Sequence, residues 1–193
     1  MSQPKIVAFA GSLRAGSLNK KLLAIAADAA GAAGAEVTIV DLRELALPLF
    51  DQDLEDASGL PEGATKLKAL LRASDGFLIA SPEYNSSITA ALKNAIDWAS
   101  RSASDDEPPL VAYKGKVAAL LATSPGALGG LRGLVTLRSI LGNIGVILLP
   151  DQVCISKAHE AFDEAGKLKD ERKVKQVNAL AMALVETLRK LRG

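Results

Sequence analysis

The chain has 193 residues, of which 49% are hydrophobic and only 4% aromatic, so its core must consist mainly of Ala, Val, Leu and Ile. A chain of this length can bury one sizeable core, and no break in composition marks a second domain, so we expect a single domain over residues 1–193. The 23 Lys and Arg residues balance 22 Asp and Glu residues without a basic block, which argues against nucleic acid as a partner.

Two further features indicate where the protein works. Its single cysteine, Cys154, excludes an intrachain disulfide and a cysteine-rich zinc or iron–sulfur site. The first residues lead directly into a short apolar run, without the hydrophobic region of a signal peptide and without an apolar span of membrane length. We therefore expect a cytoplasmic protein that does not associate with membranes.

Short apolar runs alternate with segments of helical periodicity along the chain. The predicted strands are residues 5–10, 36–40, 76–80, 116–123 and 145–149. The predicted helices are residues 18–33, 62–73, 88–100, 131–141 and 163–191. The stretches 42–61 and 101–115 are expected to be irregular, and the second has the composition of a solvated loop. This alternation predicts an α/β fold with three layers, in which helices cover both faces of a doubly wound, five-stranded parallel sheet.

Loops of small and polar residues follow three of the predicted strands. They span residues 11–17, 81–87 and 124–130. Ligands of doubly wound sheets bind beyond the carboxyl ends of the strands. The three loops are therefore expected to form one binding site.

The first of these loops has the chemistry of a phosphate site. It connects a strand to a helix, where free backbone N–H groups and the helix dipole attract anions. Gly11 and Gly16 permit close approach of a ligand, and Arg14 can hold a phosphate with two hydrogen bonds. Further side-chain donors are Ser12, Ser17 and Asn19. The alternative is an ordinary strand-to-helix turn with a serine cap.

Three well-known phosphate-binding arrangements do not fit the sequence. A Walker A loop would require Lys and Ser or Thr where Ser17 and Leu18 stand. The dinucleotide fingerprint G-x-G-x-x-G is missing, although Asp41 occupies the place of a ribose-binding acid. A phosphatase cysteine loop would need an arginine six residues after Cys154, where Glu160 stands.

The second loop suits a flat heteroaromatic ligand. Pro82 fixes a turn, Tyr84 offers an aromatic face, and Asn85 and the backbone offer amide groups for edge hydrogen bonds. The chain has a single histidine and no evident acid–base pair of side chains. These features favour a bound cofactor that carries the reaction.

Several motifs together resemble the NADPH-dependent FMN reductase family. They are Gly11-Ser12-Leu13-Arg14 followed by Ser17 and Asn19, then Pro82-Glu83-Tyr84-Asn85, and Leu92-Lys93-Asn94-Ala95-Ile96-Asp97-Trp98. With the loop 124–130, the similarity extends over residues 5–149. It implies a flavodoxin-like domain that binds FMN non-covalently. The cofactor-binding residues that it implies are Ser12, Arg14, Ser17, Asn19, Pro82, Glu83, Tyr84, Asn85, Ser124 and Gly126.

The resemblance also implies an activity. Hydride from NADPH or NADH would pass through flavin N5 to a small acceptor such as a quinone, chromate, an azo compound or free flavin, without a catalytic side chain or a metal. Family members are generally homodimers or homotetramers, and the candidate contacts here are Tyr84, Trp98 and Arg132. Many members have glycine where this chain has Ser86.

Two alternatives stay open at this point. One is a flavodoxin-like electron carrier without catalytic activity, although such carriers are usually acidic and this chain is nearly neutral. The other is a flavin-free module that binds a phosphorylated ligand.

Overall fold

Five parallel strands form the centre of the computed structural model, which describes residues 3–193. The strands are β1 (Lys5–Ala10), β2 (Glu36–Val40), β3 (Gly76–Ala80), β4 (Val117–Thr123) and β5 (Ile147–Ile155). Their order in the sheet, β2-β1-β3-β4-β5, is that of the flavodoxin-like fold. The predicted fold is therefore confirmed.

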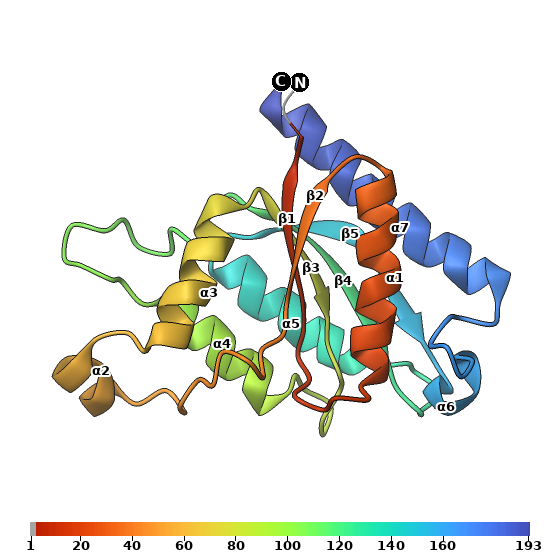
Figure 1. Ribbon diagram of the computed structural model, residues 1–193, viewed down its shortest axis with the longest axis horizontal. Helices are drawn as coiled ribbons and strands as arrows, with labels where there is room; N and C mark the ends of the chain where they lie inside the picture. The colour runs from red at the N-terminus through yellow and green to blue at the C-terminus, as the bar shows by residue number, and fades with distance from the viewer. Residues whose placement is uncertain (1–2) are drawn as a thin grey trace.

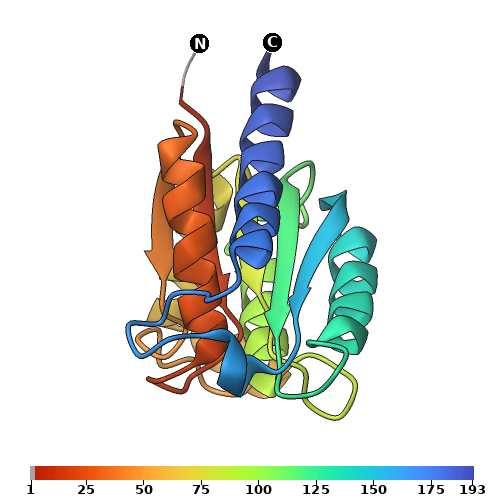
Figure 2. The same ribbon diagram turned by 90° about the vertical axis from the view of Figure 1, so that its right-hand side faces the viewer.

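Helices cover both faces of the sheet (Figures 1 and 2). One face packs against α1 (Leu18–Ala32) and α7 (Glu171–Arg192), and the other packs against α3 (Glu62–Ala73), α4 (Ala90–Ser100) and α5 (Leu131–Asn143). Every residue of β3 and β4 is buried, because these central strands are covered on both sides. None of the helices within residues 3–193 is both long and apolar enough to cross a membrane.

The structure corrects the predicted elements in three places. The stretch 42–61 contains a short helix, α2 (Gln52–Ser58), which has no buried residue and so no apolar periodicity to reveal it. Strand β5 continues to Ile155 through a register shift opposite β4, and its place at the sheet edge tolerates Pro150. The last helix begins at Glu171, because the preceding residues form the short helix α6 (Ala158–Ala161) and an irregular turn.

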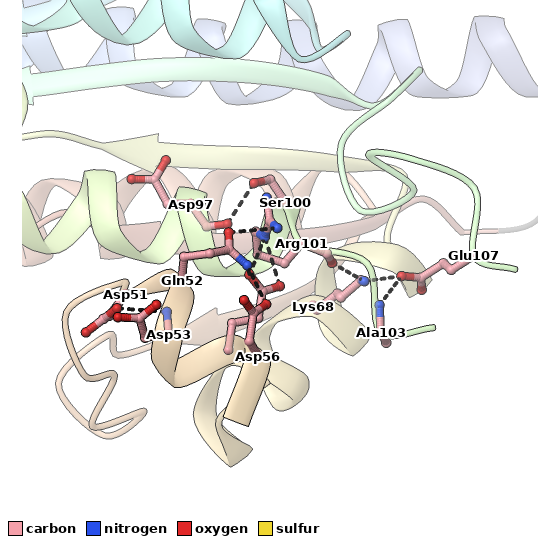
Figure 3. A network of polar contacts seen from close by, with 11 residues as sticks. Asp51, Gln52, Asp53, Asp56, Lys68, Asp97, Ser100, Arg101, Ala103 and Glu107 are labelled. Atoms are coloured by element: carbon pink, nitrogen blue, oxygen red, sulfur yellow. Dashed lines mark hydrogen bonds and ion pairs between the residues drawn. The ribbon is translucent and has the colours of Figure 1, made fainter. Parts of the chain in front are cut away.

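The segment 101–115 is more than a solvated loop. Ala112 and Tyr113 are buried, and the Glu107 carboxylate forms an ion pair with Lys68 of α3 in which both side chains are almost inaccessible to solvent. Lys68 also donates a hydrogen bond to the carbonyl oxygen of Arg101 (Figure 3). The Arg101 guanidinium in turn pairs with Glu55 of α2. We call these four side chains, Lys68, Glu107, Arg101 and Glu55, the Lys68–Glu107 network.

Candidate functional site

The three polar loops meet at the carboxyl ends of β1, β3 and β4, which are neighbours in the sheet. They surround a cavity of about 220 Å³, which we call the carboxyl-end cavity. The predicted site residues in its wall are Ser12, Arg14, Ser17, Asn19, Pro82, Glu83, Tyr84 and Ser124. Asn85 and Gly126 belong to the same loops but lie outside the wall. The sequence thus predicted which loops converge.

Close packing holds the first loop against the start of α4. The N–H of Gly11 donates to the carbonyl oxygen of Ala80 at 2.9 Å, and the Thr89 hydroxyl donates to the carbonyl oxygen of Gly11. A Cβ atom at position 11 would lie 2.9 Å from Cβ of Leu92, closer than carbon atoms can pack. Position 11 therefore requires glycine, and the loop is fixed at its entry.

Two buried serines line the cavity with unused donors. Ser17 caps α1, and its hydroxyl oxygen accepts from the N–H of Lys20 at 3.4 Å. The Ser12 hydroxyl oxygen accepts from the N–H of Arg14 at 3.4 Å. Both hydroxyls act only as acceptors within residues 3–193, which leaves their O–H groups able to donate to a ligand.

Arg14 and Asn19 differ in how many side-chain N–H groups remain free to bind a ligand. The exposed Arg14 side chain donates from Nη2 to the carbonyl oxygen of Gly16 at 3.1 Å and keeps further N–H groups. The Asn19 amide is buried and bridges to the end of β4: its Nδ2 donates to the Thr123 carbonyl at 2.9 Å, and its Oδ1 accepts from the Thr123 N–H at 3.0 Å. Asn19 therefore has a single amide proton left for a ligand.

The second loop is a tight turn with strained backbone. Tyr84 and Ser87 exchange two backbone hydrogen bonds of 2.9 and 3.0 Å, and the two residues between them, Asn85 and Ser86, have φ angles of 50° and 65°. Two consecutive left-handed residues are typical of a type I′ turn. The turn leaves the Tyr84 side chain 61% exposed at the rim of the cavity.

The Glu83 carboxylate anchors this loop to α5. The cap residue of α5 is Gly130, which has no side chain to offer, and the Glu83 carboxylate instead accepts from the N–H groups of Arg132 and Gly133 at 3.1 and 3.3 Å. It also forms an ion pair with the Arg132 guanidinium at 2.6 Å. Burial alone would raise the pKa of Glu83, but these hydrogen bonds hold it below its ordinary value.

The third loop is tied to the edge strand. The N–H of Ser124 donates to the carbonyl oxygen of Ile155 at 3.2 Å, and the Ser124 carbonyl accepts from the N–H of Ala158 at 3.1 Å. The Ser124 hydroxyl oxygen accepts from the N–H of Gly126 at 3.1 Å. Gly126 thus helps to shape the loop from behind the cavity wall.

Two of the three residues considered for subunit contacts are already engaged within the chain. Trp98 is completely buried, and its Nε1 donates to the Pro48 carbonyl oxygen at 2.8 Å, so the expectation that it reaches a partner is wrong. Arg132 is paired with Glu83. Sequence reasoning missed both pairings because each joins residues about 50 positions apart and has no local pattern. Of the three, Tyr84 has a largely exposed side chain with no such bond to another residue within 3–193.

A larger cavity of about 630 Å³ lies between α2 and the segment that follows α4. Of the charged residues in its wall, Glu55 and Arg101 are paired with each other, and the others are the acidic residues Asp56 and Asp105, which cannot donate hydrogen bonds to an anion. Gln52 bonds to Glu55, Asp56 and Arg101 (Figure 3). Residues 3–193 contain no group of His, Cys, Asp and Glu side chains that could hold a metal ion. The carboxyl-end cavity, where donors stay unused, is therefore the better candidate site.

Comparisons with known proteins identify the family. Residues 4–160 match the profile of the NADPH-dependent FMN reductase family. The chain is 37% identical to an NAD(P)H-dependent FMN reductase of Pseudomonas aeruginosa over 98% of its own length and 97% of the relative's. It is also 37% identical to an NAD(P)H:quinone oxidoreductase of Solanum tuberosum, with 98% and 95% of the two chains covered.

A solved structure extends the agreement to three dimensions. FerB, a flavoenzyme NAD(P)H:(acceptor) oxidoreductase from Paracoccus denitrificans, superimposes with a TM-score of 0.78 at 30% identity and covers 97% of this chain and 98% of its own. A family match over most of the chain, similar relatives along its whole length and the flavodoxin-like sheet order lead to one assignment. The chain belongs to the NADPH-dependent FMN reductase family and is an FMN-dependent NAD(P)H oxidoreductase.

Proposed function

We propose that the carboxyl-end cavity binds FMN, with the phosphate on the first loop and the ring system beside the second and third loops. The phosphate would accept hydrogen bonds from Ser12, Arg14 and Ser17 and from the free amide proton of Asn19. The ribityl chain and ring would lie along Pro82, Glu83, Tyr84, Asn85, Ser124 and Gly126. The observation that carries this proposal is the convergence of three loops on one cavity, in whose wall the first loop carries unused hydrogen-bond donors.

The residues present fit a phosphate. The first turn of α1 has no acidic residue, so its positive end is not neutralised by its own side chains. Gly16, beside the helix start, has open space on the side where a Cβ atom would lie. Ser12 and Ser17 bring neutral donors and Arg14 a planar cation, which is the donor set that a phosphate dianion prefers.

The second and third loops suit the ring. Tyr84 presents an exposed aromatic side chain, and Pro82 and Ser124 complete the wall beside it. FMN supplies the hydride-accepting and electron-donating chemistry that none of these side chains possesses. The role of the chain is to orient the cofactor and limit its access to water. Glu83 contributes indirectly, because its carboxylate fixes the loop to α5.

The electron acceptor is proposed from chemistry and relatives together. The FMN that we place in the cavity would donate the electrons, so the acceptor is expected to be a small molecule that can reach the flavin ring. Relatives from Solanum tuberosum and Pseudomonas putida are named as quinone reductases, and we propose quinones as the first acceptors to test, followed by chromate, azo compounds and free flavin. We also propose a cytoplasmic homodimer or homotetramer in which the exposed Tyr84 lies near the subunit boundary.

The direct test is spectroscopic. The purified protein is mixed with FMN, desalted and then given NADPH or NADH without oxygen. We expect retained flavin absorption that bleaches rapidly with either nucleotide and recovers when a quinone is added. Flavin that stays oxidised would instead indicate an electron carrier, and a protein that retains no flavin would indicate the flavin-free alternative.

Arg14→Ala tests the phosphate contact. Loss of one charge-assisted bond should weaken FMN binding by about one to two orders of magnitude. Arg172→Ala, an exposed arginine in the first turn of α7, is the matched control and should bind FMN like the original chain. Equal affinity of the Arg14→Ala variant and the original chain would refute the phosphate role of Arg14.

A further inference from the structure

A second cavity lies on the other side of the first loop. It measures about 270 Å³ and is lined mostly by apolar side chains from the first loop, the stretch after β2 and the start of α4. Leu13 belongs to its wall, whereas Ser12 and Arg14 on either side of Leu13 belong to the carboxyl-end cavity. The two cavities therefore share one loop. We call the second one the Arg43 cavity.

Arg43 is the charged residue in this wall. Its guanidinium forms no ion pair within residues 3–193, and its charge acts only at longer range on the Asp41 carboxylate, whose pKa it helps to lower. Its Nη1 donates to the carbonyl oxygen of Leu13 at 3.1 Å, and its remaining side-chain N–H groups have no acceptor within residues 3–193. The nearby Asp41 carboxylate forms its ion pair with Lys20 at 2.6 Å and accepts only the backbone N–H of Arg43. A planar cation with spare donors thus lies beside an apolar hollow.

The other polar groups of the cavity point to the same kind of ligand. The Asn94 amide is already used, because its Oδ1 accepts from the N–H of Phe50 and its Nδ2 donates to the Pro48 carbonyl, both at 2.8 Å. Ala90 and Ala91, the first two residues of α4, belong to this wall, and the first turn of that helix contains no acidic residue to offset its positive end. The site thus combines apolar surface with two sources of positive potential.

The apolar part of the wall is unusually exposed for leucine. Leu49 is 77% exposed and Leu13 is 45% exposed. A flat heteroaromatic ring placed over them would remove this surface from water. The volume suits one ring system with a sugar better than a whole dinucleotide.

We infer that the Arg43 cavity receives the adenosine end of the nucleotide donor, and that Arg43 binds the 2′-phosphate that distinguishes NADPH from NADH. This inference rests on the proposed function, because it takes NAD(P)H as the donor to a flavin in the neighbouring cavity. The adenine covers the exposed leucines, and the guanidinium and the start of α4 bind the phosphate. Arg43 is then a residue that determines donor specificity.

Direct binding tests this without turnover. Adenosine 2′,5′-bisphosphate and adenosine 5′-monophosphate are titrated calorimetrically into the FMN-loaded protein. We expect the bisphosphate to bind at least tenfold more tightly, and Arg43→Gln to remove most of that difference. Equal affinity of the two nucleotides for the original chain would overturn the inference.

Kinetics supply the second readout. In Arg43→Gln the KM for NADPH should rise about tenfold or more relative to the KM for NADH, and Arg43→Lys should restore part of the preference because it keeps the charge without the planar fork. An equal rise in the KM for both donors would show that Arg43 acts only by holding Leu13 in place through its hydrogen bond, and would overturn its role in donor specificity. Absence of turnover by the original chain with either donor would instead refute the proposed function.

A variant that keeps Arg43 tests the inference independently, in case the Arg43 substitutions disturb folding. Leu49→Asp places a negative charge at the exposed rim and should weaken the bisphosphate more than the monophosphate. Leu191→Asp, at a 62% exposed leucine in the last turn of α7, is the matched control and should change neither affinity. If Leu49→Asp also changes neither affinity, the cavity does not bind the phosphate.

Discussion

The Lys68–Glu107 network and the carboxyl-end cavity are both polar, but they differ in where their polar groups find partners. In the network, Glu107 accepts from Lys68 and from the N–H of Ala103 (Figure 3). Arg101 pairs with Glu55 and lies over the Phe50 ring. Around the cavity, Ser12 and Ser17 keep hydroxyl protons that nothing in residues 3–193 accepts. The first arrangement stabilises the fold, and the second leaves donors available for the cofactor that we propose to bind there.

The largest expected effect comes from breaking the network at Glu107. Glu107→Gln leaves the Lys68 ammonium buried without its carboxylate, which should lower the free energy of unfolding by about 3 kcal/mol near neutral pH. Denaturant unfolding followed by circular dichroism measures this loss. Glu164→Gln removes the same charge from an exposed position and should change stability by less than about 0.5 kcal/mol.

The same variant makes a pH prediction with a definite sign. The hydrogen bond from Lys68, helped by the N–H of Ala103, lowers the pKa of Glu107 below its ordinary value of 4.5. The stabilisation is therefore fully present above that value and is lost as the pH falls through the lowered pKa. The stability difference between the original chain and Glu107→Gln should shrink in acid, and a constant difference would contradict the assignment.

A somewhat smaller effect is expected at the entry to the first loop. Gly11→Ala forces a Cβ atom to within 2.9 Å of Cβ of Leu92, and overpacking of this kind should cost about 2 kcal/mol. Because the loop must shift to relieve the contact, FMN binding should weaken as well. Thermal unfolding without FMN and a flavin titration measure the two effects.

Gly16→Ala is the control for this substitution. A Cβ atom at position 16 meets nothing within 4 Å, so the stability of the protein without FMN should stay within about 0.5 kcal/mol of the original. If Gly11→Ala and Gly16→Ala were equally stable, the close contact between the first loop and α4 would not contribute to the free energy of unfolding.

The smallest effect is a gain in the strained second loop. Ser86 has a φ of 65°, which costs a serine more than a glycine, and Ser86→Gly should raise stability by about 0.5 kcal/mol after the greater freedom of glycine in the unfolded chain is subtracted. Ser87→Gly, at a neighbouring position without a positive φ, should instead lower stability. Chemical denaturation of both variants gives the comparison, and a gain at Ser87 equal to that at Ser86 would exclude backbone strain as the cause.

The sequence was sufficient for the parts of the fold that depend on local periodicity. The strands β1, β2 and β3 lie where the apolar runs place them, and the loops after β1, β3 and β4 converge as the parallel topology requires. It was insufficient for α2, whose residues are all at least partly exposed and so carry no apolar stripe.

Hydrogen bonds and ion pairs between residues far apart in the chain could not be predicted from the sequence either. Glu83 is predicted to border the cofactor, but nothing in the sequence indicated that its carboxylate also caps α5 and pairs with Arg132, 49 positions away. Trp98 was expected to contact a partner subunit, but it is completely buried and donates to the carbonyl oxygen of Pro48, 50 positions earlier. Side chains of the same type can serve a ligand or a fold, and only the neighbours in space decide between them.

The two hydrogen bonds between the Asn19 amide and the Thr123 backbone affect the order of folding and cofactor binding. They join residues 104 positions apart, so the start of α1 acquires its final form only after β4 has been added to the sheet. In a partly folded chain that contains the first loop but lacks β4, the proposed phosphate-binding site is therefore incomplete. Flavin should then be captured late, by nearly native molecules, and its binding should stabilise the whole domain against unfolding by an amount that rises with the logarithm of the free flavin concentration once that exceeds the dissociation constant.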